Sequence, residues 1–404
     1  MTQFYFVEPV DSLFIRGNLA FGDSGEHGAS VMPPPPSLLA GAFRSAILGG
    51  AGDALARYVG QGATGDASLD AALGTLDPRT GQVIRSGTFR VAWVSLAGRR
   101  ETTGTPWVDP VFPLPTDLVK LDQGFARLSP EPANPLVADG RELPCVAVLR
   151  SPRQTKPEGA VYLSAAGWQS HLAGELPDGT SGAVKAADLH TRNPRLGIGL
   201  DAGAGTVESG LIYTTEGYAF SPTDDPAKPR QEPKPFVATG FLVGISGADG
   251  LLPAAGFLRL GGQGRGARYQ RLDFRPPAPP LESIARSGRF RFILATPGLF
   301  ADGWLPPGVR REGADDLWSA GGCTARLVCA AVPRREVISG WDLFAWKPKD
   351  AQRAVPAGSV YWFEDLQGHP DKLAAWADSG ISGDHPNHQR QAEGYNLAWL
   401  AAWK

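Results

Sequence analysis

Residues 31–48 read Val-Met-Pro-Pro-Pro-Pro-Ser-Leu-Leu-Ala-Gly-Ala-Phe-Arg-Ser-Ala-Ile-Leu, and this stretch predicts how the chain begins to fold. The four prolines at 33–36 fix φ and remove four backbone donors, which predicts an extended arm. Ser37 follows where a helix N-cap is expected. Apolar residues then recur at a spacing of four and predict one buried helix face: Leu39, Phe43 and Ile47. Arg44 lies off that face, together with the small residues Gly41 and Ser45. The helix could simply pack on a sheet, or its small-residue side could let another backbone approach closely.

A strand is expected before this helix. Residues 4–7 are aromatic and apolar, and Pro9 ends the run. A loop that is rich in glycine between Gly22 and Gly28 connects the strand to the proline arm. Strand, loop, arm and helix in this order are typical of the opening of a βαββαβ unit, the ferredoxin-like scaffold that RNA-recognition modules share. The sequence therefore predicts an α+β fold.

Two alternating patterns flank a second proline-rich stretch. Before it, Leu272 and Phe274 predict one face of a strand, and the arginines and aspartate between and beside them predict the other. After it, residues 290–294 alternate again. We therefore expect an N-terminal domain at 1–274, a Pro-rich linker at 275–281 and a C-terminal domain at 282–404.

Blocks of sequence over nearly the whole chain resemble one protein family. They are Glu8-Pro9-Val10-Asp11 with Leu13-Phe14 and Arg16, Pro33 to Ser37 with Ala40-Gly41 and Arg44, Arg195 to Asp201 with Gly210 to Tyr213, Leu260 to Arg265, Thr296 to Phe300 with Gly303 to Pro306, Ser339 to Asp342, and Val355 to Tyr361. In this order they resemble the third-subunit family of the Cmr complex, the type III-B CRISPR effector, within the RAMP superfamily. The resemblance implies two ferredoxin-like (RRM-like) domains with long loop insertions in the first.

The largest insertion is expected at about residues 99–190. This segment has little periodicity and many prolines. We predict an isolated strand at 161–163 and a short helix at 166–172, and otherwise loops of the kind that bind ligands or are locally flexible.

The composition of the 404 residues excludes several classes of protein. A net charge of −2 at pH 7 is unusual for a protein that only binds nucleic acid, so any basic surface has to be local. The three cysteines, Cys145, Cys323 and Cys329, form no CxxC pair, which favours a reducing cytoplasm over a disulfide scaffold or zinc ribbon. No 18-residue apolar run or secretion signal occurs, so we expect no membrane association.

The positive charge concentrates between residues 259 and 291. This segment has only two acidic residues against eight arginines: Arg259, Arg265, Arg268, Arg271, Arg275, Arg286, Arg289 and Arg291. Glycines at 261, 262, 264 and 266 would let backbone N–H groups reach an anion. A phosphate cradle for an RNA backbone is one interpretation, and a solvated, arginine-rich sheet face is the other. No P-loop or GxGxxG pattern is present, so we expect no nucleotide cofactor.

The resemblance implies that this glycine-rich loop holds the repeat-derived 5′ handle of the crRNA. Gln263 stands where the family often has glutamate. A projecting hairpin that begins near His190 is expected beside the guide. The residues expected to contact RNA are Arg16, Ser37, Arg44, His190, Arg192, Arg195, Gly261, Gly262, Gly264, Arg265 and Arg268. His190 or Tyr269 would stack on a base, unless these aromatic rings belong to the core.

Catalytic and metal-binding patterns are weak. Related RAMP ribonucleases use histidine as a general acid or base, and His27 is the candidate to test. His385 and His388 have a ligand-like spacing but no matching cysteine or acidic ligand. We therefore predict a non-catalytic RNA-binding subunit without metal or cofactor. A stand-alone RAMP endoribonuclease that processes guide RNA and a protein-only assembly subunit are the alternatives.

The expected partners are the crRNA, the large polymerase-like Cmr subunit and the backbone RAMP subunits. Eleven tryptophans, several of them near the C-terminus, exceed what a small sheet can bury. We therefore predict an aromatic partner surface on the C-terminal domain. Trp341 in the Ser-Gly-Trp-Asp block is interpreted as a core anchor.

Overall fold

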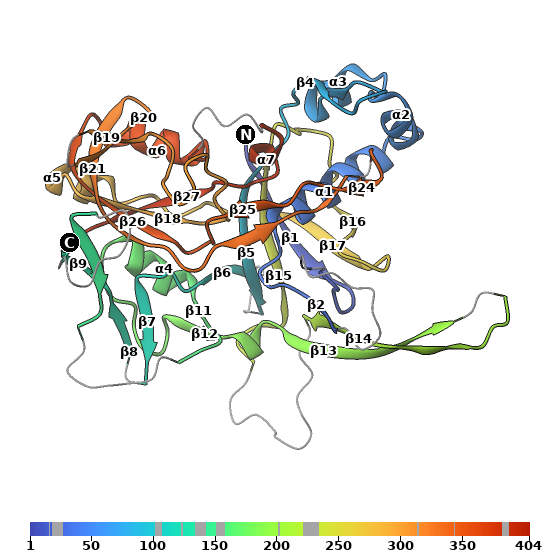
Figure 1. Cartoon of the computed structure of the whole chain (residues 1–404), viewed down its shortest axis with the longest axis horizontal. Helices are drawn as coiled ribbons and strands as arrows, with labels where there is room; N and C mark the ends of the chain where they lie inside the picture. Colours follow the sequence, from blue (N-terminus) through green and yellow to red (C-terminus); the bar gives the residue numbers. More distant parts are fainter. Residues whose placement is uncertain are drawn as a thin grey trace.

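Two antiparallel sheets pack face to face and organise the chain (Figure 1). The computed structural model describes residues 1–15, 17, 27–101, 107–122, 124–133, 143–150, 158–200, 203–220, 234–312, 315–342, 344–381 and 388–404. No helix among these residues is long and apolar enough to cross a membrane.

The first sheet has eight strands in the order β12-β11-β6-β5-β15-β1-β17-β16. Their bounds are β1 Gln3–Pro9, β5 Arg90–Arg100, β6 Trp107–Pro113, β11 Val161–Leu163, β12 Ala183–Lys185, β15 Ala238–Ser246, β16 Ala255–Arg259 and β17 Gly266–Leu272. Side chains alternate along β1: Tyr5 and Val7 face one core, and Phe4 and Phe6 face the other. The first sheet therefore has apolar packing on both faces.

Helix α1 (Pro36–Gly49) covers the Tyr5 face. The predicted apolar face of this helix is confirmed, since Leu39, Phe43 and Ile47 are all buried. The predicted N-cap is wrong: Pro35 takes that position and Pro36 starts the helix, where a missing N–H costs nothing. The hydroxyl of Ser37 instead lies 3.1 Å from that of Tyr395.

The second sheet has six strands in the order β19-β20-β21-β26-β18-β27. Their bounds are β18 Phe290–Leu294, β19 Val309–Glu312, β20 Asp315–Ala320, β21 Cys323–Ala331, β26 Val360–Gln367 and β27 Ala398–Ala402. Helices α5 (Leu281–Ser287) and α6 (Pro370–Asp378) cover its outer face. On the inner face, Ile293 and Trp362 share one core with Phe6 and Leu242 of the first sheet. The two sheets thus stabilise each other by burying a common apolar layer.

Smaller elements surround the sheets. They are β2 His27–Ala29, α2 Ala54–Gln61, α3 Ala67–Leu73, β3 Thr75–Leu76, β4 Val83–Arg85, β7 Leu118–Leu121, β8 Gly124–Arg127, β9 Ser129–Pro132, β10 Cys145–Val148, α4 Ala165–Leu172, the 3₁₀ turn η1 Ala186–Asp188, β13 Thr191–Leu200, β14 Val207–Ala219, β22 Glu336–Ile338, β23 Trp341–Asp342, β24 Lys347–Pro348, β25 Gln352–Ala354 and α7 His388–Ala392. Strands β13 and β14 form a long hairpin that projects from the rest of the chain (Figure 1).

The segment predicted as an irregular insertion contributes to the first sheet. Its predicted helix is confirmed as α4, but the strand predicted as isolated, β11, pairs with both β6 and β12. Prolines at 110 and 113 concealed β6 in the sequence. Pro110 fits there because β11, among the described residues, pairs with β6 only at Phe112 and Pro113, which leaves the edge of β6 at Pro110 without a partner strand. Pro113 is the last residue of β6.

Residues 275–280 connect β17 to α5 without regular structure. The alternation expected just before them is confirmed, because Leu272 and Phe274 pack against the shared core and Arg271 and Arg275 are exposed. The division into domains at this connection stays a prediction.

Candidate nucleic-acid interface

The glycine-rich loop between β16 and β17 packs against the segment that follows β1. The amide of Gly262 donates a hydrogen bond to the carbonyl oxygen of Phe14 (2.8 Å). Gly261 has φ +79°, and a Cβ there would lie only 2.8 Å from that same oxygen. Gly264 has φ +67° and would place a Cβ in open space. Backbone packing therefore explains Gly261, whereas Gly264 presents bare backbone on the open side of the loop.

Asp11 joins this loop to the projecting hairpin. Arg265 pairs with Asp11, and Nη2 of Arg195 lies 3.4 Å from its Oδ1. Nη2 of Arg195 also donates to the hydroxyl of Ser12 (2.7 Å). Two guanidinium groups thus surround one carboxylate, so these arginines fix the site while part of their positive charge remains uncompensated. The exposed Arg192, near the start of β13, pairs with Glu216 at 3.5 Å.

The eight arginines of the basic segment do not gather at one place. Arg291 is buried between the sheets, and Arg289 lies over the ring of Trp403 at 4.9 Å. Arg268 on β17 stands opposite Phe257 on β16, and Arg259 lies two residues further along β16. Both arginines are exposed, and Phe257 is 72% exposed. The cationic surface next to the glycine loop is therefore this strand pair, supported by Arg265.

His190 and Tyr269 lie in the core. His190 is 9% exposed, and its Nε2 lies 3.2 Å from the hydroxyl of Tyr162. The ring of Tyr218 packs against it at 4.9 Å. Tyr269 packs edge-on against Tyr5 at 5.7 Å. Their burial leaves no ring face for a base, so the base-stacking interpretation of both residues is replaced by the core one.

Burial of His190 makes stability depend on pH. It lowers the pKa of His190 to about 4. The unfolded chain protonates this group below about pH 6.5, so it binds more protons than the native state between pH 6.5 and 4. We expect His190 to lower the free energy of unfolding by about 2 kcal/mol on going from neutral pH to pH 5. Urea titrations of the wild type and His190→Gln at both pH values measure this, and equal pH slopes in the two proteins would contradict it.

His171 is expected to leave a slope of the same sign in the variant. It is fully buried, and burial lowers its pKa as well. The comparison therefore concerns the difference between the two slopes, not their absolute values.

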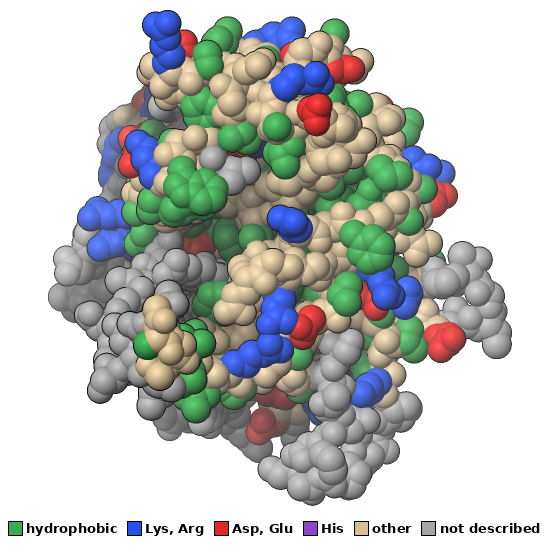
Figure 2. All heavy atoms as spheres, turned by 90° about the vertical axis from the view of Figure 1, so that its right-hand side faces the viewer, with side chains coloured by type: hydrophobic (Ala, Val, Ile, Leu, Met, Phe, Trp, Pro, Cys, Tyr) green, Lys and Arg blue, Asp and Glu red, His purple; other side chains and the backbone are tan. Residues whose placement is uncertain are grey.

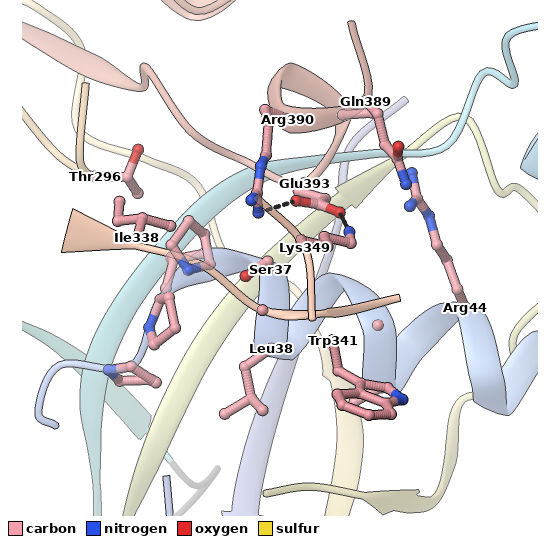
Figure 3. A pocket seen from close by; sticks show the side chains of 18 of the residues that line it. Ser37, Leu38, Arg44, Thr296, Ile338, Trp341, Lys349, Gln389, Arg390 and Glu393 are labelled. Carbon is pink, nitrogen blue, oxygen red and sulfur yellow. Dashed lines mark hydrogen bonds and ion pairs between the residues drawn. The ribbon is translucent and has the colours of Figure 1, made fainter. Parts of the chain in front are cut away.

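A cleft of about 1670 Å³ continues from the glycine loop across α1 (Figure 3). Arg259, Gly261 and Gly262 line one part of it, and the proline arm at 33–36 lines another. The opposite wall comes from residues 336–342, 344, 348–349, 351 and 389–393. In Figure 3, Glu393 lies between Lys349 (2.6 Å) and Arg390 (3.2 Å). Segments from both ends of the chain thus build this cleft.

Arg44 extends from α1 into the cleft, where Figure 3 shows it pointing toward Gln389. Its guanidinium stacks on the ring of Phe89 at 5.0 Å. Its Nε is buried and has no hydrogen-bond partner among the described residues. Burial lowers the pKa of Arg44, although Glu393 opposes that effect. An anion in the cleft would satisfy this group.

Trp341 also lines the cleft and is 52% exposed, so its interpretation as a core anchor is wrong. Its ring meets that of Trp346 edge-on at 5.8 Å. Trp346 is 72% exposed, whereas Trp318 and Trp362 are buried in the sheets. Figure 2, which faces the right-hand side of Figure 1, shows Lys and Arg side chains among exposed hydrophobic ones.

The side chains of four predicted positions cannot be placed. Arg16 and His385 lie outside the described residues, and the side chains of His27 and His388 do as well. Sequence reasoning did not select Asp11 or Phe257, and it assigned no site role to Arg259. Asp11 stood in a resembling block, but only the folded chain brings it next to Arg195 and Arg265.

The geometry defines a mixed α/β protein of antiparallel sheets with a basic, glycine-rich loop beside a cleft. Its sequence places it in a family: the model of the CRISPR-associated protein (Cas_Cmr3) family matches residues 5–403, so the chain belongs to this family. It is thus a third subunit of a Cmr, or type III-B CRISPR, effector.

Two solved structures resemble this chain at 15% sequence identity and a TM-score of 0.47. One is a chain of the type III-B Cmr-beta bound to cognate target RNA and AMPPnP in state 1, with 98% of this chain and 95% of that chain covered. The other is a chain of the type III-B Cmr-beta bound to cognate target RNA, with 98% and 96% covered. No curated protein matches the sequence.

Proposed function

We propose that this chain is a non-catalytic RNA-binding subunit that holds the repeat-derived 5′ handle of the crRNA. One observation carries this proposal: the loop with bare backbone at Gly264 lies between two strands that bear exposed arginines. Backbone N–H groups and guanidinium groups both bind phosphate oxygens without reading a base. The handle would lie along Arg259 and Arg268, with Arg265 and Arg195 held in place by Asp11.

We infer that both sheets are built on the ferredoxin-like order. Four strands of the first sheet lie in the order β17-β1-β15-β5, which is fourth, first, third and second in chain order, and four strands of the second sheet lie in the matching order β27-β18-β26-β21. In each sheet one of the two crossovers is helical, and its first helix is α1 in the first sheet and α6 in the second. Residues 247–254 form no helix, nor do the described residues between 295 and 322. On this basis we place the domain boundary at 275–281.

The proposed protein partners are the large polymerase-like subunit and the backbone RAMP subunits. Exposed Trp346 and the 46% exposed Val337 support docking of the large subunit near the 336–349 segment. The predicted aromatic surface is thereby confined to this segment, because the other C-terminal tryptophans are at least partly buried.

Binding of the full-length chain to RNA tests this function. Fluorescence anisotropy with a labelled repeat-derived 5′-handle RNA is expected to give an affinity that falls with salt, with a slope of about −0.7 for each phosphate contact. The RNA is expected to stay intact during the incubation. Binding that is undetectable at low salt would contradict the proposal.

The enzyme alternative is separated in the same incubation. Metal-independent cleavage at one site in the repeat, lost in His27→Ala, would show a processing ribonuclease instead.

A further inference from the structure

The indole of Trp341 lies on the wall of the cleft, and other side chains cover only part of it. It belongs to the two-residue strand β23, which pairs with β24. Figure 3 shows the side chain extending from its strand toward α1. About half of it is exposed, and its only described ring contact is the edge of Trp346. A flat, half-exposed indole beside a cleft is suited to stacking with a planar group.

The charges of the cleft favour an anionic occupant. The basic side chains that line it are Arg44, Arg85, Arg90, Arg259, Lys349 and Arg390. The acidic ones are Glu336, Asp342 and Glu393. Asp342 accepts hydrogen bonds from the amides of Phe344 and Ala345 (2.9 Å each), and Glu393 is paired to Lys349 and Arg390. Burial raises the pKa of Glu336, which disfavours its charged form.

The walls of the cleft do not favour a peptide strand. An added strand needs backbone donors and acceptors along one edge. The proline arm at 33–36 has no N–H groups, so that wall offers only carbonyl oxygens. Stacking on an aromatic ring and pairing with guanidinium groups, in contrast, are the two contacts that single-stranded RNA makes with proteins.

We infer that the cleft receives a single-stranded RNA segment, with one base stacked on Trp341 and a phosphate at Arg44. This inference rests on the proposed function, because the cleft is continuous with the glycine loop through Arg259, Gly261 and Gly262. The strand leaves the loop, crosses α1 and passes beneath the β23–β24 hairpin. The buried Nε of Arg44 gains a phosphate oxygen as its partner.

Anisotropy of the full chain with the labelled 5′-handle RNA tests the two contacts separately. Trp341→Ala is expected to weaken binding about tenfold with an unchanged salt slope, since stacking on an aromatic side chain is worth about 1–3 kcal/mol and involves no ion release. Trp341→Phe is expected to restore most of the affinity. Arg44→Gln is expected to weaken binding and to reduce the salt slope by about 0.7.

Trp107→Ala is the matched control, because Trp107 is 63% exposed and lies on β6, outside the cleft lining. Thermal melting confirms that each variant is folded. If the wild type binds and Trp341→Ala binds like Trp107→Ala, the inference is wrong while the proposed function stands. If Trp341→Ala retains RNA but loses the large subunit on co-purification, the cleft is a protein-docking site. Absence of wild-type binding overturns both.

Discussion

Replacing Arg291 with leucine is expected to lower the free energy of unfolding by about 3–5 kcal/mol, because it removes the cation that compensates a buried carboxylate. Arg291 is 1% exposed and pairs with the fully buried Asp117. Its Nη2 donates to the carbonyl of His171 (2.8 Å) and its Nε to that of Ala402 (3.1 Å). One side chain therefore connects β18 to β27, to α4 and to the loop before β7. Urea unfolding monitored by tryptophan fluorescence measures the loss.

The charge of Asp117 accounts for the size of this effect. Burial alone would raise the pKa of its carboxyl group, but His171 and Arg291 hold it well below the usual range. Arg289→Leu is the matched control two residues away, since Arg289 is exposed, and we expect it to cost less than 1 kcal/mol. Adding Asp117→Asn to Arg291→Leu is expected to recover part of the loss. Equal effects of the Arg291 and Arg289 variants would mean that the buried charges are not coupled.

Reversing the charge of Arg259 and Arg268 together is expected to weaken binding of the 5′-handle RNA at least about 100-fold. Each substitution to glutamate removes a phosphate contact and adds a repulsive charge beside the strand. Both side chains are exposed, so the fold is expected to be unchanged. Anisotropy at two salt concentrations measures the affinity, and circular dichroism checks the fold.

Arg310→Glu with Arg311→Glu is the control for net charge. These two arginines are also exposed and lie on β19, at the edge of the second sheet. Their reversal changes the charge of the chain equally and is expected to weaken binding less than threefold, because salt screens the repulsion between the RNA and charges this far away. Similar losses in both double variants would mean that binding depends on net charge and not on the glycine-loop strands.

Local periodicity predicted the elements that bury one face. The spacing of Leu39, Phe43 and Ile47 located the core side of α1, and the alternation at Leu272 and Phe274 located the inner face of β17. Prolines concealed regular structure at two places. Pro36 was accepted in the first helical turn, and Pro110 was accepted in a strand with a largely unpaired edge. The first outcome is a local property of the first helical turn, where no N–H is needed, whereas the second depends on β11, which is remote in the sequence.

The sequence predicted the type of site, but it did not predict which residues form it. The glycine loop was visible because positive φ and close backbone approach demand glycine, as at Gly261. A run of arginines does not show which of them are buried: Arg291 on β18 is buried against Asp117 and His171, whereas Arg289, which precedes β18, is exposed. Trp341 was assigned to the core because tryptophan is usually buried. Only its place on a two-residue strand above α1 leaves it exposed.

Whether the glycine loop holds the crRNA handle is tested most directly by photo-crosslinking. The assembled effector would carry 4-thiouridine-substituted crRNA, and mass spectrometry of this subunit would locate the crosslinks. We expect handle nucleotides to crosslink to the peptide spanning residues 257–269, around the glycine loop. Crosslinks from the handle that fall only on other surfaces of this chain, or on other subunits alone, would contradict it.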